Sequence, residues 1–265
     1  MPKLLFVTTT NLSTNPRLLK ELKLASENGY ECTFIGFKLG NWSDKTEQEH
    51  SKSFDKVKSI YLSAHKESFI DWIVATLVWK FSLSLAMVFD KSRKVSAYAH
   101  NKRTWQLTRK LNKIKKDFDL VIAHNLGSLY PAFVFSKKSN IPFAFDIEDY
   151  HPGEKCSPAE KHRRELLMRK LLPKAGYVSY ASPLIGQYSA DLLTKKSAPK
   201  LKTVYIRSGT RCISVDSHKE VLEYETYTMP ENFLVNNSFL KRIQVGGKYY
   251  GENSICLVLA KYHMG

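Results

Sequence analysis

The stretch DLVIAHNLGSLYPAFVFSKKSNIPFAFDIEDYHPGE, residues 119–154, decides the fold. Residues 119–123 are a short run rich in Val, Ile and Leu, which is typical of a strand buried on both faces. Residues 126–139 have helical length and an apolar stripe, and Asn140 is a suitable stop. Residues 141–145 return as a second buried run. The pattern predicts two parallel strands joined by a helical crossover, which is the repeating unit of an open α/β sheet.

Polar side chains follow both of these predicted strands. His124 and Asn125 follow the first strand. The residues at and beyond the end of the second strand are Asp146, Glu148, Asp149, Tyr150 and His151. Because ligands bind beyond the carboxyl ends of the strands in open α/β sheets, we expect a functional site at this edge.

The same alternation of strands and helices extends over residues 1–206 and predicts a Rossmann-like, doubly wound parallel sheet. Further strands are expected at 4–9, 32–37, 57–62, 177–181 and 203–206, and further helices at 16–28, 158–172 and 183–193. Residues 38–54 are polar and are predicted to form an exposed loop. The loop after the first strand has no GxGxxG, so dinucleotide binding is disfavoured. The alternation stops in residues 207–265, which are expected to form an irregular tail.

An apolar and basic helical insertion is predicted at residues 69–116. Its first part, residues 69–89, has the length to cross a bilayer, but the charge of Lys80 near its centre costs roughly 2.5–3.5 kcal/mol there, which disfavours spanning. Residues 91–116 contain ten Lys and Arg and no acidic side chain. One interpretation is an interfacial helix followed by a basic helix on anionic headgroups, and the other is a core helix followed by a solvated basic helix. The candidate membrane-binding residues are Trp72, Trp79, Lys80, Lys91, Arg93, Lys94, Lys102 and Arg103.

The charge of the chain is strongly uneven. Residues 51–116 hold fifteen of the 41 basic side chains and four of the 25 acidic ones, so most of the net charge of +16 lies there. Such an excess favours a phosphate-bearing surface, either lipid or nucleic acid. No zinc-finger, RNP-type or helix-turn-helix signature is present, so nucleic acid is not favoured.

Four widely spaced cysteines form no CxxC pair, which indicates neither a disulfide framework nor a zinc site. The amino terminus leads directly into a strand without a basic and apolar leader, so a cytoplasmic location is expected.

Three segments, in order, resemble the amino-terminal domain of family 4-like (group 1) glycosyltransferases. They are TTTNLSTNPRLLKELKLASENGYECTFIGF (8–37), the stretch at 119–154, and LLPKAGYVSYASPLIGQY (171–188). The resemblance covers roughly residues 1–206. It implies one half of a GT-B fold, in which the first domain holds the acceptor and the second holds a nucleotide-sugar donor. It further implies a retaining reaction without a metal, and a sugar or lipid-linked acceptor at the inner face of the cell membrane, as in surface-polysaccharide synthesis.

The candidate catalytic residues are Asp146, Glu148 and His151. Many family members carry Asp-x-His-Glu after this strand, whereas this chain has Asp-Ile-Glu-Asp at 146–149 and a displaced histidine. Carboxylates here are suited to bind sugar hydroxyls, and one of them to assist deprotonation. The alternative for Glu148 and Asp149 is that they cap a turn or form an ion pair with Arg163 or Arg164.

The candidate substrate-binding residues are Asn11, Arg17, His124, Asn125 and Asp149. Asn11 and Arg17 come from the first loop and helix, where an acceptor or a phosphate at a helix start is within reach. The alternatives are a solvated Arg17 and a structural His124. His151 with Glu154 and Cys156 does not have the geometry of a metal site, so no metal is expected.

A donor domain is not recognisable in residues 207–265, which are too few for a domain of typical size. Glu223 and Glu231 have the Glu-x7-Glu spacing of family donor sites, but Pro230 and the absence of nearby glycines favour coincidence. We therefore expect a truncated or frame-shifted tail and little activity from this chain alone. The alternative is a non-enzymatic Rossmann-like module that binds anionic membrane, or less readily nucleic acid, through its basic face.

Overall fold

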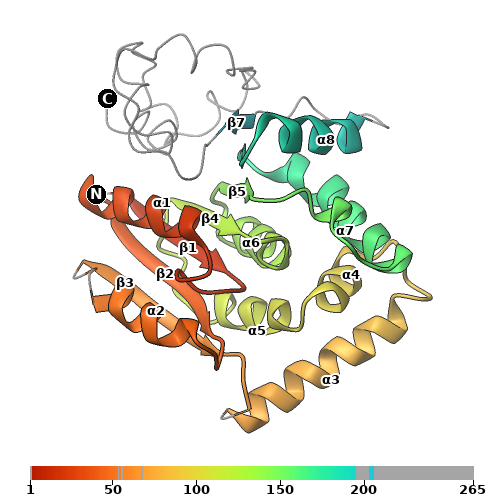
Figure 1. Cartoon of the computed structure of the whole chain (residues 1–265), viewed down its shortest axis with the longest axis horizontal. Coiled ribbons are helices and arrows are strands. Elements are labelled where there is room, and N and C mark those ends of the chain that lie inside the picture. The colour runs from red at the N-terminus through yellow and green to blue at the C-terminus, as the bar shows by residue number, and fades with distance from the viewer. Residues whose placement is uncertain (1, 53, 55, 67, 195–202, 206–265) are drawn as a thin grey trace.

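The computed structural model describes residues 2–52, 54, 56–66, 68–194 and 203–205, which form a seven-stranded sheet with the order β3-β2-β1-β4-β5-β6-β7 (Figure 1). The strands are β1 (Lys3–Thr8), β2 (Glu31–Lys38), β3 (Val57–Ser63), β4 (Leu120–His124), β5 (Phe143–Ile147), β6 (Tyr177–Tyr180) and β7 (Thr203–Tyr205). All neighbouring strands are parallel. The strand order reverses between β1 and β4, as in a doubly wound, Rossmann-like sheet, so the predicted fold class is confirmed.

The helices lie between successive strands. They are α1 (Pro16–Glu27), α2 (Ser43–Lys52), α3 (Phe69–Leu85), α4 (Arg93–His100), α5 (Lys102–Leu111), α6 (Leu126–Ser139), α7 (Pro158–Leu171) and α8 (Pro183–Thr194), with 3-10 turns η1 (His151–Gly153) and η2 (Leu172–Lys174). The side chain of Asn15 accepts from the Leu18 amide at the start of α1, and Ser157 accepts from the Glu160 amide at the start of α7. These side chains satisfy backbone amides that a helix start leaves unpaired.

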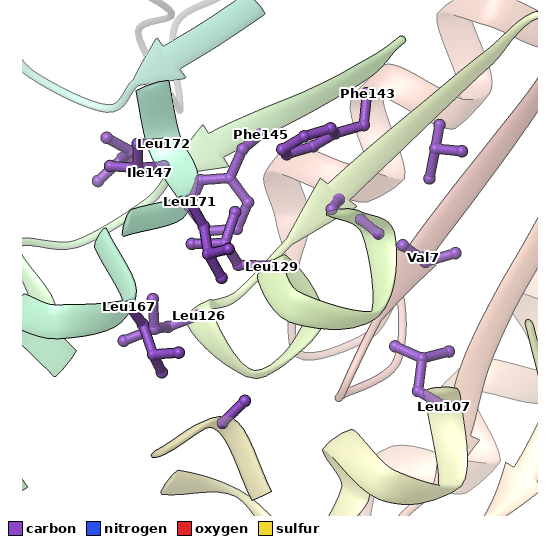
Figure 2. Packing of buried hydrophobic residues seen from close by; sticks show 14 of the residues in the cluster. Val7, Leu107, Leu126, Leu129, Phe143, Phe145, Ile147, Leu167, Leu171 and Leu172 are labelled. Carbon is purple, nitrogen blue, oxygen red and sulfur yellow. The ribbon is translucent and has the colours of Figure 1, made fainter. Parts of the chain in front are cut away.

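The sheet has an apolar core on each face. On β1, Leu4 and Phe6 pack in the cluster that contains α1, whereas Leu5 and Val7 belong to the cluster that contains α6. This division follows from the two-residue period of a strand. Figure 2 shows the second core, where α6 lies among side chains of β5, α5 and α7. Burial of each large apolar side chain stabilises the folded state by roughly 1.5–3 kcal/mol. The cores on both faces therefore stabilise the sheet.

The prediction of an exposed loop at residues 38–54 is wrong for residues 43–52, which form α2. Its anchors are polar. Asp44 accepts from the amides of Leu39 and Gly40, and buried Glu47 accepts from the Ser13 amide and the Tyr61 hydroxyl. Because this helix has no apolar stripe, hydrophobic periodicity does not reveal it.

The prediction of one continuous basic helix at residues 91–116 is also wrong. Two helices, α4 and α5, meet at Asn101, which ends the first and accepts from the Arg103 amide to cap the second. Asn101 has an extended backbone (φ −146°), which interrupts the helical path.

Helix α3 lies on the outside of the molecule and packs on α4 and α5, which in turn pack on α6 (Figure 1). No helix among the described ranges has both the length and the apolar character needed to cross a bilayer. The predictions for residues 207–265, including those for Glu223 and Glu231, lie outside the described residues.

Candidate functional site

A row of polar residues crosses four neighbouring strands near their carboxyl ends. In the register of the sheet, Thr8 is paired with His124, His124 with Asp146, and Asp146 with Ser179. Each lies two residues beyond an apolar residue of the α1-side core, so the row faces α1. The edge that the sequence indicated therefore contains polar residues of β4 and β5 side by side.

Arg17 of α1 binds Asp146 with two hydrogen bonds. Its Nε donates to Oδ2 and its Nη2 donates to Oδ1, both at 2.6 Å, and the Ser179 hydroxyl donates to Oδ1 as well. Burial alone would raise the pKa of the Asp146 carboxyl, but the hydrogen bonds and charge of Arg17 outweigh it and lower that pKa. Asp146 is 1% exposed. The two groups neutralise each other inside the protein, so this geometry does not favour a catalytic Asp146 or a ligand-binding Arg17, and both roles stay predictions.

His124 is fully buried between two carboxylates. Its Nε2 lies 2.8 Å from Glu21 Oε2, and its Nδ1 lies 2.9 Å from Glu148 Oε1. Burial lowers the pKa of the imidazole, but the charge of Glu21 and the hydrogen bonds of both carboxylates raise it to about 10. His124 is thus protonated at neutral pH and donates from both nitrogens, so the structure favours the structural interpretation of this residue over direct substrate binding.

Glu148 joins the starts of two helices. Oε1 accepts from the side-chain amide of Asn15 and lies beside the imidazolium, while Oε2 accepts from Nδ2 of Asn125 at 2.7 Å. Asn125 Oδ1 in turn accepts from the hydroxyls of Thr8 and Thr10. The Glu148 side chain is 14% exposed, and Thr10 and Asn125 are half-buried.

We call Thr10, Asn125 and Glu148 the rim cluster, and Arg17, Glu21, His124, Asp146 and Ser179 the buried layer. Asn125 has a positive φ of 66°, an uncommon conformation for a residue other than glycine. Such backbone conformations persist where surrounding contacts hold them, and they are frequent at ligand sites. The rim cluster is therefore the part of this edge that is both preorganised and accessible.

Three predicted site residues do not belong to the rim cluster or to the buried layer. Asn11 is fully buried and donates to the Ser43 hydroxyl at 2.8 Å while accepting from the Thr14 amide, and its role as a ligand contact stays a prediction. Asp149 is exposed. His151 binds Glu154, its ring nitrogen Nδ1 lying 2.7 Å from Oε1. Within the described ranges it makes no hydrogen bond to the rim cluster.

The alternative pairing of Glu148 or Asp149 with the arginines of α7 is wrong. Arg164 donates to Glu154 and Glu160, and Arg163 donates to Glu160. These ion pairs connect η1 to the start of α7, and Glu148 binds within the rim cluster instead.

The sequence did not single out Glu21, Ser179, Asn15 or Thr10. A signal for Glu21 existed, because Arg17 and Glu21 are four residues apart on the same face as buried Leu18 and Leu22. Two opposite charges on the apolar side of a helix indicate buried charged partners in the element beneath it.

Glu21, His124 and Asp146 present three possible metal-ligand atoms within 4.8 Å of one another. In the structure these atoms are bound within the protein, because Arg17 donates to both oxygens of Asp146 and His124 lies between Glu21 and Glu148. Charge compensation among these side chains accounts for their positions.

No family model and no curated protein sequence matches the chain. Among solved structures, it is similar to TcCGT1 in complex with UDP (13% identity, 84% of this chain and 55% of that one, TM-score 0.45). It is also similar to Anabaena HepE with UDP-glucose (13%, 80% and 45%, TM-score 0.45). A third is the lipopolysaccharide outer core galactosyltransferase WaaB in its apo form (16%, 80% and 47%, TM-score 0.44). The chain spans about half the length of these proteins.

Proposed function

We propose that the described residues form the acceptor-side half of a glycosyltransferase, and that the rim cluster binds a sugar hydroxyl of the acceptor. The proposal is supported by the resemblance of the three sequence segments and by the strand order of the sheet. By the same resemblance, the proposed acceptor is lipid-linked or a surface polysaccharide, and the donor is a nucleotide-sugar held by a second domain.

The position of the rim cluster is the observation that carries this proposal. Its residues follow β1, β4 and β5, and the strand order reverses between β1 and β4. At such a reversal the neighbouring loops diverge and leave a crevice, where open α/β sheets bind ligands. Hydroxyl, amide and carboxylate groups at that place are those that hydrogen-bond the hydroxyls of a sugar.

Glu148 Oε2 is the atom best suited to receive the acceptor hydroxyl. Oε1 already accepts two hydrogen bonds, from Asn15 and His124, whereas Oε2 accepts one, from Asn125. A carboxylate oxygen accepts about two, so Oε2 keeps a free position. A hydroxyl bound there is oriented, and its proton has a base to move toward during transfer.

The buried layer supports this carboxylate from below. Protonated His124 faces Glu148 and is itself fixed by Glu21, so the rim carboxylate has a cation behind it. The asparagines at the starts of α1 and α6 fix the orientation of Glu148 through further hydrogen bonds.

The test is sugar binding measured by saturation-transfer difference NMR on the full chain, with a panel of monosaccharides and oligosaccharides. We expect binding by the wild type and a loss of about tenfold or more in Glu148→Gln, because one hydrogen bond to a charged group is worth roughly that factor. Thr10→Val removes a neutral hydroxyl, so we expect a smaller loss of about two- to tenfold. Glu49→Gln, at an exposed position of α2, is the matched control, and we expect it to bind as the wild type does.

Absence of sugar binding, or undiminished binding by both rim variants with circular dichroism unchanged, would overturn the proposal. A parallel measurement with UDP-glucose addresses the donor. Transfer of saturation to its uridine protons that Glu148→Gln abolishes would show that the rim cluster holds donor instead of acceptor.

A further inference from the structure

The outward face of α3 is apolar and exposed along its length. Ile70, Leu77 and Phe81 are 76%, 60% and 66% exposed, and their spacing of seven and four residues places them on one side of the helix. The exposed Phe69 adjoins them, and the next turn continues the surface with Met87, Val88 and Phe89. We call these seven residues the α3 surface. Contiguous apolar surfaces of this kind mark interaction sites on soluble domains.

The inner face of α3 is fixed to the protein. Ala75 and Ser82 are buried, and the indole Nε1 of Trp79 donates to the Ala99 carbonyl at 2.9 Å. The ring of Trp72 lies beneath the amines of Lys66 and Lys102, which are 5.6 and 5.7 Å from its centre. The helix is therefore held with its apolar side outward by specific contacts on the other side.

Several residues of the predicted membrane-binding set make contacts within the protein. Trp72, Trp79 and Lys102 are used to hold α3, Arg103 donates to the Thr9 carbonyl, and Arg93 stacks over Phe133. The predicted cations that remain exposed without such contacts are Lys80, Lys91 and Lys94.

The charge around the α3 surface is positive. Lys80 lies on the flank of the helix beside Phe81, and Lys91 follows the apolar turn by two residues. Among the described residues, two acids lie nearby: Asp71 pairs with Arg109 at 3.3 Å, and Asp90 precedes Lys91 in the chain. An apolar stripe with a cationic border is complementary to the acyl chains and headgroups of an anionic bilayer.

We propose that the α3 surface docks on an anionic lipid bilayer, with α3 lying in the plane of the interface. A second copy of the chain is a poorer occupant, because a two-fold contact through this surface would place Lys80 and Lys91 of each copy against the same positive border. The helix is roughly 25 Å long, so docking along it orients the whole sheet on the membrane. The inference does not depend on the rim cluster or on sugar transfer.

The experiment is flotation of the full chain with phosphatidylcholine vesicles, with and without phosphatidylglycerol. Three variants separate the contributions. The face variant is Ile70→Ser/Leu77→Ser/Phe81→Ser, the charge variant is Lys80→Glu/Lys91→Glu, and the control is Trp42→Ser/Leu184→Ser, which removes apolar side chains that are equally exposed but lie off α3.

We expect the wild type and the control to float with anionic vesicles. The face variant should bind at least about tenfold more weakly, and the charge variant should lose the preference for anionic lipid. Failure of the wild type to bind, or equal binding by the face variant, would overturn the proposal.

A wild type that dimerises in sedimentation equilibrium without binding vesicles, and that the face variant makes monomeric, would assign the α3 surface to a second copy and likewise overturn it. Glu148→Gln should still float, and the face variant should still bind soluble sugars, so a failure here and a failure of the proposed function are distinguishable.

Discussion

Besides its apolar packing, α1 is connected to the sheet by charged side chains that lie in the interior. Arg17 and Glu21 of α1 reach Asp146 and His124 on β5 and β4, and all four are 6% exposed or less. A buried ion pair adds little net stability, but removing one partner leaves an unpaired charge in the interior. A single substitution in the buried layer should therefore lower the free energy of unfolding by more than the intact ion pairs contribute to it.

Asp146→Ala should lower the free energy of unfolding by about 3–5 kcal/mol, because it leaves the Arg17 guanidinium buried without its carboxylate. Urea denaturation followed by circular dichroism measures this. Asp71→Ala is the matched control, since it removes an exposed Asp–Arg pair worth at most about 1 kcal/mol. Equal costs for the two substitutions would contradict the account of the buried layer.

The pH dependence of stability should report on His124. Its pKa is raised in the folded protein from 6.5 to about 10, so its contribution is fully present below pH 6.5 and is lost as pH rises through about 10. Urea midpoints across this window should fall more steeply for the wild type than for His124→Asn. Parallel profiles for the two proteins would mean that the imidazole is not charged in the folded state.

Two helices distant in sequence are tied together by one carboxylate. Glu160 of α7 lies 2.5 Å from the His100 ring of α4 and accepts from Arg163 and Arg164 of its own helix. Burial raises the pKa of this carboxyl, but His100 and the arginines outweigh it and lower the pKa to about 2. Because α3 packs on α4, this tie also holds the outer helix in place.

Glu160→Gln should speed amide hydrogen exchange in α3 and α4 while β1, β4 and β5 stay protected, because local opening draws on the least anchored elements. The wild type should show the same loosening as pH falls from 4.5 toward 2, since the stabilisation from a lowered carboxyl pKa disappears as the group is protonated. Glu165→Gln, whose pair with Arg169 is exposed, serves as the control. Uniform acceleration over the whole sheet would refute a local role.

Elements with their own start and stop signals could be predicted from the sequence, whereas those held by distant partners could not. Helix α6 has the predicted bounds, because Asn125 precedes it and left-handed Asn140 (φ 54°) ends it. Helix α2 was missed because its anchors, Asp44 and Glu47, are polar and act through tertiary contacts.

The candidate site divides in the same way. The sequence placed His124, Asn125, Asp146 and Glu148 at one edge, and the register of β4 and β5 brings them together. Their roles could not be predicted, because Glu21 and His124 are 103 residues apart and Arg17 and Asp146 are 129 apart. No local pattern encodes which charge a buried residue meets.

The whole molecule depends on one sheet that is shared by two cores. Leu22 of α1 packs on one face and Leu129 of α6 on the other, and both are fully buried. Because each of the strands β1 to β6 contributes side chains to both cores, loss of packing on one face weakens the support of the other. The described part of the chain should therefore unfold as a single cooperative unit.

Leu22→Ala and Leu129→Ala should each lower the free energy of unfolding by about 2–5 kcal/mol, the cost of a cavity left by a buried leucine. Far-UV circular dichroism and tryptophan fluorescence should give coincident transitions for both variants. A transition that splits in only one of them would indicate that the two faces unfold separately.

The outward position of α3 has a consequence for how such a protein diversifies. The helix reaches the sheet through α4 and α5, so the side chains on its outer surface belong neither to the buried layer nor to the rim cluster. Under the two proposals, membrane docking and sugar binding therefore depend on separate parts of the chain. Evolution or protein engineering can therefore replace the outer helix, and with it the proposed docking surface, without changing the residues of the rim cluster.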